Sequence, residues 1–140
     1  MNVILDNDVN LQNYRPDYPV LIVRGKVEIK VNPLNLSESD YSHNYNPIGA
    51  PYQGQTDSDQ FDQYPSEING LVHATGEIKF MVASSKVVGT VISDGTVKVE
   101  ENPQIIHDPN LVVDPPQGYA KINTGGEMRI VPGSWRKVMN

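Results

Sequence analysis

Five short segments of this chain share one pattern, and that pattern restricts the fold more than any other property of the sequence. Each begins with a marker residue, glycine in four segments and asparagine in the first, and then alternates polar with apolar residues. The segments are residues 7–11, 25–29, 76–80, 95–99 and 126–130. Residues 68–80 also align without a gap on residues 87–99, 19 positions later. A fixed period with strand-like alternation is typical of a β-solenoid, in which each repeat forms one coil.

The alternation predicts which side chains face the interior. Successive residues of a strand point to opposite sides, so the positions two and four away from each marker share one face. These positions are apolar except for Ser93 and Thr124. The apolar ones are Val3, Leu5, Val9, Leu11, Leu21, Val23, Val27, Ile29, Val72, Ala74, Ile78, Phe80, Val91, Val97, Val99, Ile122, Met128 and Ile130. We therefore predict a narrow interior filled mainly by aliphatic side chains.

The predicted fold is all-β: a single-stranded right-handed β-helix (solenoid) of about five coils. The right hand is expected because parallel strand connections are almost always right-handed. A left-handed β-helix is an alternative, since Gly70 and Gly76 are six residues apart and Gly89 and Gly95 repeat that spacing. A β-sandwich is the second alternative. Parallel pairing of Val72 with Val91 favours a coil, whereas consecutive strands of a sandwich would pair antiparallel.

The distances between markers predict one domain, residues 1–140, with two inserted loops. Gly25 and Gly76 are 51 positions apart, which is one 19-residue coil plus 32 residues. Gly95 and Gly126 are 31 apart, which is one coil plus 12. We place the insertions at coil corners, at about residues 32–66 and at a Pro-rich loop of about residues 102–119. Trp135 is expected to cover the lower end of the coil.

Charge and composition exclude several classes of partner. The net charge is −6, and residues 32–66 hold five acidic residues without a lysine or arginine. A chain without a basic stripe lacks the groups that bind phosphate, so neither nucleic acid nor direct contact with a membrane is expected. The chain has no cysteine, which excludes thiolate metal sites and thiol catalysis. Self-association through the coil ends is the remaining expectation for this scaffold.

The acidic insertion is the segment most suited to binding. Long loops in compact domains are usually functional or disordered, and this one is rich in aromatic residues. The candidates for binding a protein or a glycan are Tyr41, Tyr45, Tyr52, Phe61 and Tyr64. Rigid aromatic side chains of this kind supply contact area at a low entropic cost. The alternative is that they pack the insertion against the flank of the coil.

The same insertion contains a candidate Ca²⁺ site at Asp57, Asp59 and Asp62. Calcium takes several oxygen ligands, and backbone carbonyls of an irregular loop can complete the set. The spacing differs from that of an EF-hand, because no glycine follows and the twelfth position is Ile68. A solvated acidic turn is the alternative. No other cofactor is expected.

No catalytic residues are predicted. Ser93 and Asp94 with His73 or His107 have the residue types of a hydrolytic triad, but the chain lacks a G-x-S-x-G elbow. His73 falls on an outward position and is expected to be a surface histidine. His107 and Asp108 precede a proline, which is typical of a turn. We therefore expect that the protein is not an enzyme.

Residues 68–76, 88–95, 106–111 and 115–119 carry a resemblance to a known group of proteins. They follow the pattern I-x-G-V/L-V/I-x-x-x-G, repeated, then a His-Asp step and a Pro-rich exit. The chain from about residue 46 to 138 resembles the C-terminal β-helical region of bacterial prepilin-like (PilX-type) envelope proteins. A weaker similarity is to bactofilins, which are small β-helices that polymerise end to end.

The resemblance implies an extracytoplasmic, cell-envelope location and an N-terminal pilin-like membrane helix, which residues 1–140 do not contain. If no such helix precedes Met1, the compartment stays open. The expected function is a non-enzymatic structural or surface-interaction module of a bacterial cell-envelope or pilus-like assembly. A carbohydrate-binding or carbohydrate-active β-helix protein is the alternative.

Overall fold

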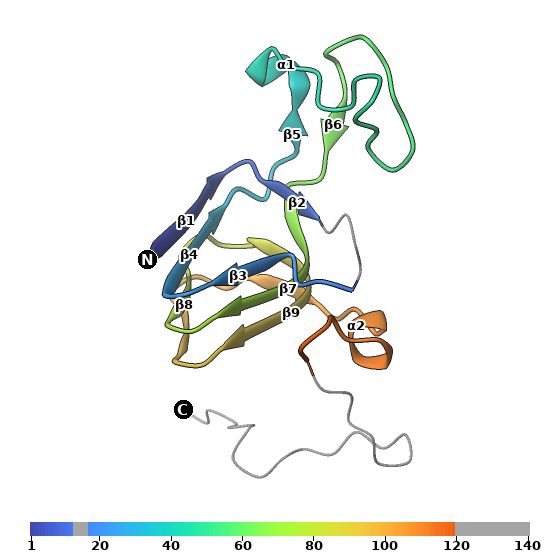
Figure 1. The fold of residues 1–140 in the computed structure, drawn as a ribbon. Coiled ribbons are helices and arrows are strands. Elements are labelled where there is room, and N and C mark those ends of the chain that lie inside the picture. Colours follow the sequence, from blue (N-terminus) through green and yellow to red (C-terminus); the bar gives the residue numbers. More distant parts are fainter. Residues whose placement is uncertain (13–16, 120–140) are drawn as a thin grey trace.

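The computed structural model describes residues 1–12 and 17–119, and most of its regular elements are strands (Figure 1). Two short helices, α1 (Glu38–Tyr41) and α2 (Asn110–Val113), accompany them. The strands are β1 (Asn2–Asn7), β2 (Asn10–Gln12), β3 (Leu21–Val23), β4 (Lys26–Val31), β5 (Leu36–Ser37), β6 (Gln63–Tyr64), β7 (Glu67–Ala74), β8 (Ile78–Phe80), β9 (Lys86–Ser93), β10 (Val97–Val99) and β11 (Gln104–Ile106). Within these residues no helix combines the length and hydrophobicity needed to span a bilayer.

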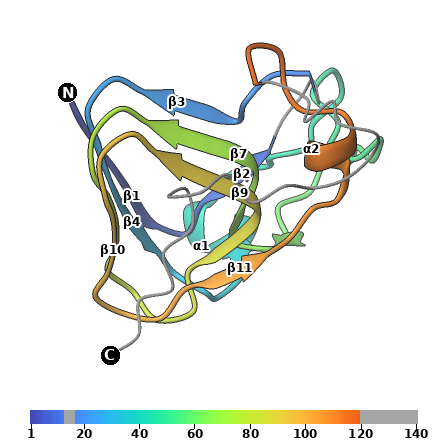
Figure 2. The same cartoon turned by 90° about the horizontal axis from the view of Figure 1, so that it is seen from below.

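Two parallel sheets form the body of the molecule. Sheet A has the order β1-β4-β8-β10, and sheet B has the order β11-β9-β7-β2, with β3 also paired to β7. From β3 onward the chain alternates between the sheets, so equivalent strands of successive repeats lie side by side (Figure 2). Val72 pairs with Val91 and Ile78 with Val97, both in parallel ladders. The predicted all-β class and the 19-residue register are confirmed, and the pairing is not that of an antiparallel sandwich.

The first repeat was predicted in the wrong register. Val3 pairs with Val27, so β1 lies in sheet A, whereas the pattern had placed Val3 before a marker in the other strand of the coil. Leu11 pairs with Ile68 and lies in sheet B. The cause is Asn7, which has a φ of 62° and ends β1 in a turn that resembles a glycine marker in sequence. The backbone of Met1 occupies the equivalent place beside Gly25.

The core follows the predicted inward face. Its fully buried members come from both sheets, and partly buried residues of the first repeat pack against them. They are Val23, Val27, Ile29, Val31, Ile68, Val72, Ala74, Ile78, Phe80 and Val87. Val97 and Val99 were also predicted to face inward, but they are 47% and 50% exposed. They lie in β10, which is the edge strand of sheet A among the described residues.

Glycines allow neighbouring backbones to approach closely at two places. Gly76 follows sheet B at the turn into sheet A, and a Cβ there would lie 2.8 Å from the carbonyl oxygen of Gly25. Gly70 and Gly89 pair directly inside β7 and β9, with φ values of 136° and 148°. β2 pairs with β7 before Gly70, and β3 pairs with β7 after it. Glycine is required at positions 76 and 89, because an added Cβ would collide with the backbone of the preceding repeat.

The two predicted insertions differ in the structure. β4 ends at Val31 and β7 begins at Glu67, so residues 32–66 lie between consecutive strands of the body. Residues 102–119 are not a simple loop, because they contain β11 and α2. Ile105 pairs with Val87, so the parallel pairing of sheet B continues into this segment. Ile122, Thr124, Met128, Ile130 and Trp135 lie outside the described residues.

Candidate functional site

The insertion forms an ordered unit at one end of the body (Figure 1). β5 and β6 pair antiparallel, Leu36 with Tyr64 and Ser37 with Gln63, and α1 follows β5 directly. The ends of the insertion are thereby held together beside the first repeat. Ser66 connects the end of the insertion to the first repeat, because its hydroxyl accepts a hydrogen bond of 3.1 Å from the Val9 amide.

A buried carboxylate organises the interior of the insertion. Glu38 Oε1 accepts hydrogen bonds from the Tyr45 amide and the Tyr64 hydroxyl, both at 2.7 Å, and Oε2 accepts one from the Asp62 amide at 3.2 Å. Burial acts to raise the pKa of Glu38, but the three hydrogen bonds outweigh it and hold the pKa below its usual value. Burial also raises the pKa of Tyr64, and its bond to Glu38 adds to that shift. The sequence analysis missed Glu38, which has no local motif around it.

We expect the change Glu38→Gln to loosen the insertion and leave the parallel sheets intact. The amide places an N–H₂ group where the carboxylate accepted hydrogen bonds, so one buried donor loses its partner. Hydrogen exchange at the amides of Tyr45 and Asp62 should accelerate, while exchange at Ile78 stays slow. The control is Asp40→Asn, which removes a charge from an exposed position of the same helix. Equal acceleration in both variants would contradict this role for Glu38.

A groove of about 510 Å³ lies between the insertion and the first repeat. It is lined by Asp8, Val9, Asn10, Leu11, Gln12, Leu36, Tyr41, Tyr45, Tyr52 and Tyr64. Four of the five aromatic residues proposed from the sequence therefore line one groove. Phe61 is the fifth; it is 80% exposed and is not part of the lining.

The tyrosines divide into a packing group and an accessible group. Tyr64 is buried and stands edge-to-face with Tyr45 and Tyr52, at ring-centre distances of 6.1 and 4.7 Å. Tyr41 and Tyr45 are 47% and 38% exposed. Tyr64 therefore packs the interior of the insertion, whereas Tyr41 and Tyr45 are partly accessible, and the role of these two in binding stays a prediction.

The opposite wall of the groove carries polar groups from residues 8–12. The Tyr41 hydroxyl donates to Asp8 Oδ2 at 2.9 Å, and this bond raises the pKa of Tyr41. The other oxygen, Asp8 Oδ1, is buried and has no hydrogen-bond partner within residues 1–12 and 17–119. Asn10 Nδ2 donates to the Pro65 carbonyl at 2.8 Å, and Gln12 Nε2 donates to Asn10 Oδ1 at 3.2 Å. A buried carboxylate oxygen without a donor is costly.

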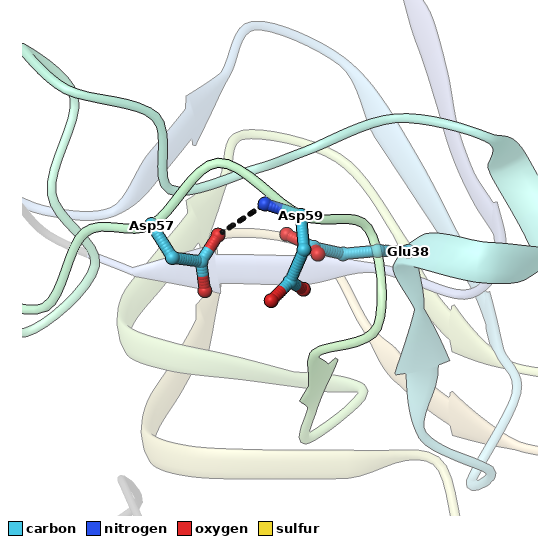
Figure 3. Close-up of side chains that lie close together, drawn as sticks. All are labelled: Glu38, Asp57 and Asp59. Atoms are coloured by element: carbon cyan, nitrogen blue, oxygen red, sulfur yellow. Dashed lines mark hydrogen bonds between the residues drawn. The ribbon is translucent and has the colours of Figure 1, made fainter.

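Acidic side chains gather at a second place in the insertion. One carboxylate oxygen each from Glu38, Asp57 and Asp59 lies within 4.8 Å of the others, and Figure 3 shows the three groups from separate parts of the chain brought together. Asp57 and Asp59 were predicted; Glu38 was not. The carboxyl group of Asp62, the third predicted residue, lies against that of Asp57. This contact raises the pKa of Asp62, burial raises it further, and the Asn46 amide lowers it.

The residues considered for hydrolysis do not form a triad. The Ser93 hydroxyl donates to the Gly76 carbonyl at 2.7 Å and accepts from the Gly95 amide at 3.1 Å. It therefore stabilises the turn between β9 and β10. His73 instead contacts Asp94 at 3.0 Å and the Tyr119 hydroxyl at 2.6 Å. Asp108 accepts a hydrogen bond from the Asn110 amide at 3.0 Å, in the turn before α2.

Comparisons of this chain with protein families, with curated proteins and with solved structures found no match.

Proposed function

We propose that this protein is a non-enzymatic interaction module whose tyrosine-lined groove binds a glycan. The observation that carries this proposal is the groove itself, which the partly exposed Tyr41 and Tyr45 line together with Asp8. Sugar rings offer apolar C–H faces, which stack on aromatic rings, and hydroxyl groups, which donate to carboxylates and amides. Tyrosine combines an apolar ring with a polar end and suits both contacts. The volume of the groove is within the range of small-ligand sites.

Binding is favoured over hydrolysis by the carboxylates of the groove. Most glycosidases use a pair of carboxylates, one as acid and one as base or nucleophile. Among the described residues that line this groove, Asp8 is the one carboxylate, and one of its oxygens is already held by Tyr41. This composition supports recognition of a sugar without turnover.

The wider setting of the module follows from the parallel sheets and the sequence resemblance. We propose that the strands form a right-handed β-helix and that the chain belongs to a bacterial cell-envelope or pilus-like assembly. The strand-rich body is compatible with such a coil, and the prepilin-like pattern of residues 46–138 favours an extracytoplasmic place. In that setting the coil is the support, its ends are surfaces for self-association, and the insertion is the recognition element.

The proposal predicts that Tyr41→Ala and Tyr45→Ala weaken glycan binding. The experiment screens the wild-type chain against an array of bacterial cell-wall and surface polysaccharides and measures Kd for each hit by calorimetry. Loss of one stacking ring removes roughly 1–2 kcal/mol, which is about a 5- to 30-fold rise in Kd. The matched control is Phe61→Ala, since Phe61 is an exposed aromatic of the same insertion outside the groove.

Three results would contradict this function. The first is the absence of binding to every polysaccharide of the array at millimolar sugar concentration. The second is an equal loss of affinity in Phe61→Ala and Tyr41→Ala, which would place binding outside the groove. The third is release of reducing ends from a bound polysaccharide, which would make the protein a carbohydrate-active enzyme.

A further inference from the structure

We propose that Glu38, Asp57 and Asp59 bind one Ca²⁺ ion, with the side-chain oxygen of Asn46 as a further ligand. The first support is geometry. The three carboxylates each present an oxygen within 4.8 Å of the others, a span that two Ca–O bonds of about 2.4 Å can bridge. They reach this space from α1 and from the loop before β6 (Figure 3). The site does not depend on the glycan groove.

The ligands are held in place by the insertion itself. Glu38 is fully buried and is fixed by three donors, which leave one lone-pair position on Oε2. Asp57 Oδ1 accepts from Asn44 Nδ2 at 3.0 Å and from the Asp59 amide at 3.2 Å. Asp59 Oδ1 accepts from the Phe61 amide at 3.0 Å. Each carboxylate therefore keeps acceptor capacity while its orientation is set.

A second observation, independent of the acidic residues, points to a cation. Asn46 is 2% exposed, and its Oδ1 is buried without a hydrogen-bond partner among the described residues. The residue is held next to the cluster through Asp57, whose amide donates to the Asn46 carbonyl at 3.2 Å, while its Nδ2 donates to Asp62 Oδ2 at 3.0 Å. An unpaired amide oxygen on a residue bonded to Asp57 is explained if it is a ligand to a hard cation.

The local charge balance supports the same conclusion. Residues 32–66 contain five carboxylates and no lysine or arginine, and among the described residues none of these carboxylates takes part in an ion pair. Converging carboxylates in a partly buried space repel one another unless a positive charge separates them. A bound dication would remove this repulsion and connect α1 to the loop of Asp57.

The ligand chemistry favours calcium over other metals. The cluster offers oxygen ligands from carboxylates and an amide, without cysteine or histidine, which suits a hard cation. Calcium accepts six to eight oxygens in flexible geometry, so carbonyl groups and water can complete an irregular site. Magnesium demands near-ideal octahedral geometry at about 2.1 Å, which side chains of one irregular loop meet less readily.

The test is calorimetric titration of the chelator-treated, full-length chain with CaCl₂ at constant ionic strength. We expect one ion per chain with a Kd below about 1 mM, and a rise in melting temperature that EDTA reverses. The double variant Asp57→Asn, Asp59→Asn should raise Kd at least tenfold. Asparagine keeps the oxygens that accept the local amide hydrogen bonds, so the loop should retain its fold. The matched control Asp40→Asn removes a charge from the same insertion and should bind as the wild type does.

Each other outcome overturns the proposal. Absence of heat and of a melting shift at 5 mM CaCl₂ means that the cluster is a solvated acidic surface. An equal response to Ca²⁺, to Mg²⁺ and to added NaCl means charge screening without a site. Unchanged affinity in the double variant, with the insertion shown to be folded by its amide spectrum, places the ion elsewhere on the chain.

Discussion

Replacing Ile78 by aspartate is expected to unfold the protein. Ile78 is fully buried, pairs with Val27 on one side and with Val97 on the other, and faces the aliphatic interior. A carboxylate at this position has no donor or cation within the core. Its burial costs more than about 5 kcal/mol, which is comparable to the entire net stability of about 5–15 kcal/mol for a domain. Circular dichroism should show the loss of strand signal at 25 °C.

The matched control is Ile22→Asp, which makes the same chemical change in a parallel strand of the same body. Ile22 lies in β3 between two inward residues, points outward and is 63% exposed. We expect its melting temperature to stay close to that of the wild type, since exposed substitutions usually change stability by less than about 0.5 kcal/mol. Similar melting temperatures for the two variants would show that the assignment of inward and outward faces is wrong.

The change Gly89→Ala is expected to cost at least about 3 kcal/mol. The residue has a φ of 148°, which an L-amino acid rarely adopts, and its Cβ would collide with the carbonyl oxygen of Gly70 in the neighbouring strand. Two backbones would have to separate in the middle of sheet B. Urea denaturation should detect the loss as a lower midpoint at an unchanged slope.

Gly54→Ala separates the two causes of that loss. Gly54 also has a positive φ, 80°, but an added Cβ would have no atom within 4 Å. It should therefore lose only the backbone preference of glycine, about 1 kcal/mol. A loss in Gly89→Ala no larger than in Gly54→Ala would contradict the steric role of the paired glycines.

The pairing register of the two parallel sheets was predictable from the sequence, because a constant repeat length determines which residues lie opposite one another on neighbouring strands. Val72 and Val91 are 19 residues apart, and a repeat that keeps its length must place such residues on neighbouring strands. The first repeat could not be placed in the same way. Asn7 precedes the same polar–apolar pattern as the glycine markers, but in the structure it is the last residue of β1. β11 was missed for a related reason: Gln104–Ile106 is a strand that carries no glycine, between segments that proline makes irregular.

The candidate site was predictable by composition and not by geometry. Tyrosines and aspartates concentrated in one insertion indicated the segment that contains both the groove and the acidic cluster. Asp8 and Glu38 could not be foreseen, because their importance lies in contacts with residues 33 and 26 positions away, Tyr41 and Tyr64. Contacts across such distances depend on how the insertion packs against the parallel sheets, which the period does not specify.

The two kinds of connection between sheets A and B differ in how they accept changes in length. At the glycine corner, equivalent inward residues of the two sheets are always four positions apart: Val23 and Val27, Ala74 and Ile78, Ser93 and Val97. At the opposite corner the interval is six, 39, seven and six: Leu5 to Leu11, Ile29 to Ile68, Phe80 to Val87, Val99 to Ile105.

The glycine corner is closed to insertions, because backbone contacts such as that of Gly76 with Gly25 leave no space between successive turns. One extra residue in so tight a turn would shift the next strand by one position, which exchanges its inward and outward faces. Insertions are accommodated at the other corner, where connections of different lengths lead from sheet A to the same parallel pairing in sheet B. The segments between β8 and β9 and between β10 and β11 are therefore natural positions for grafting a foreign recognition loop onto this scaffold.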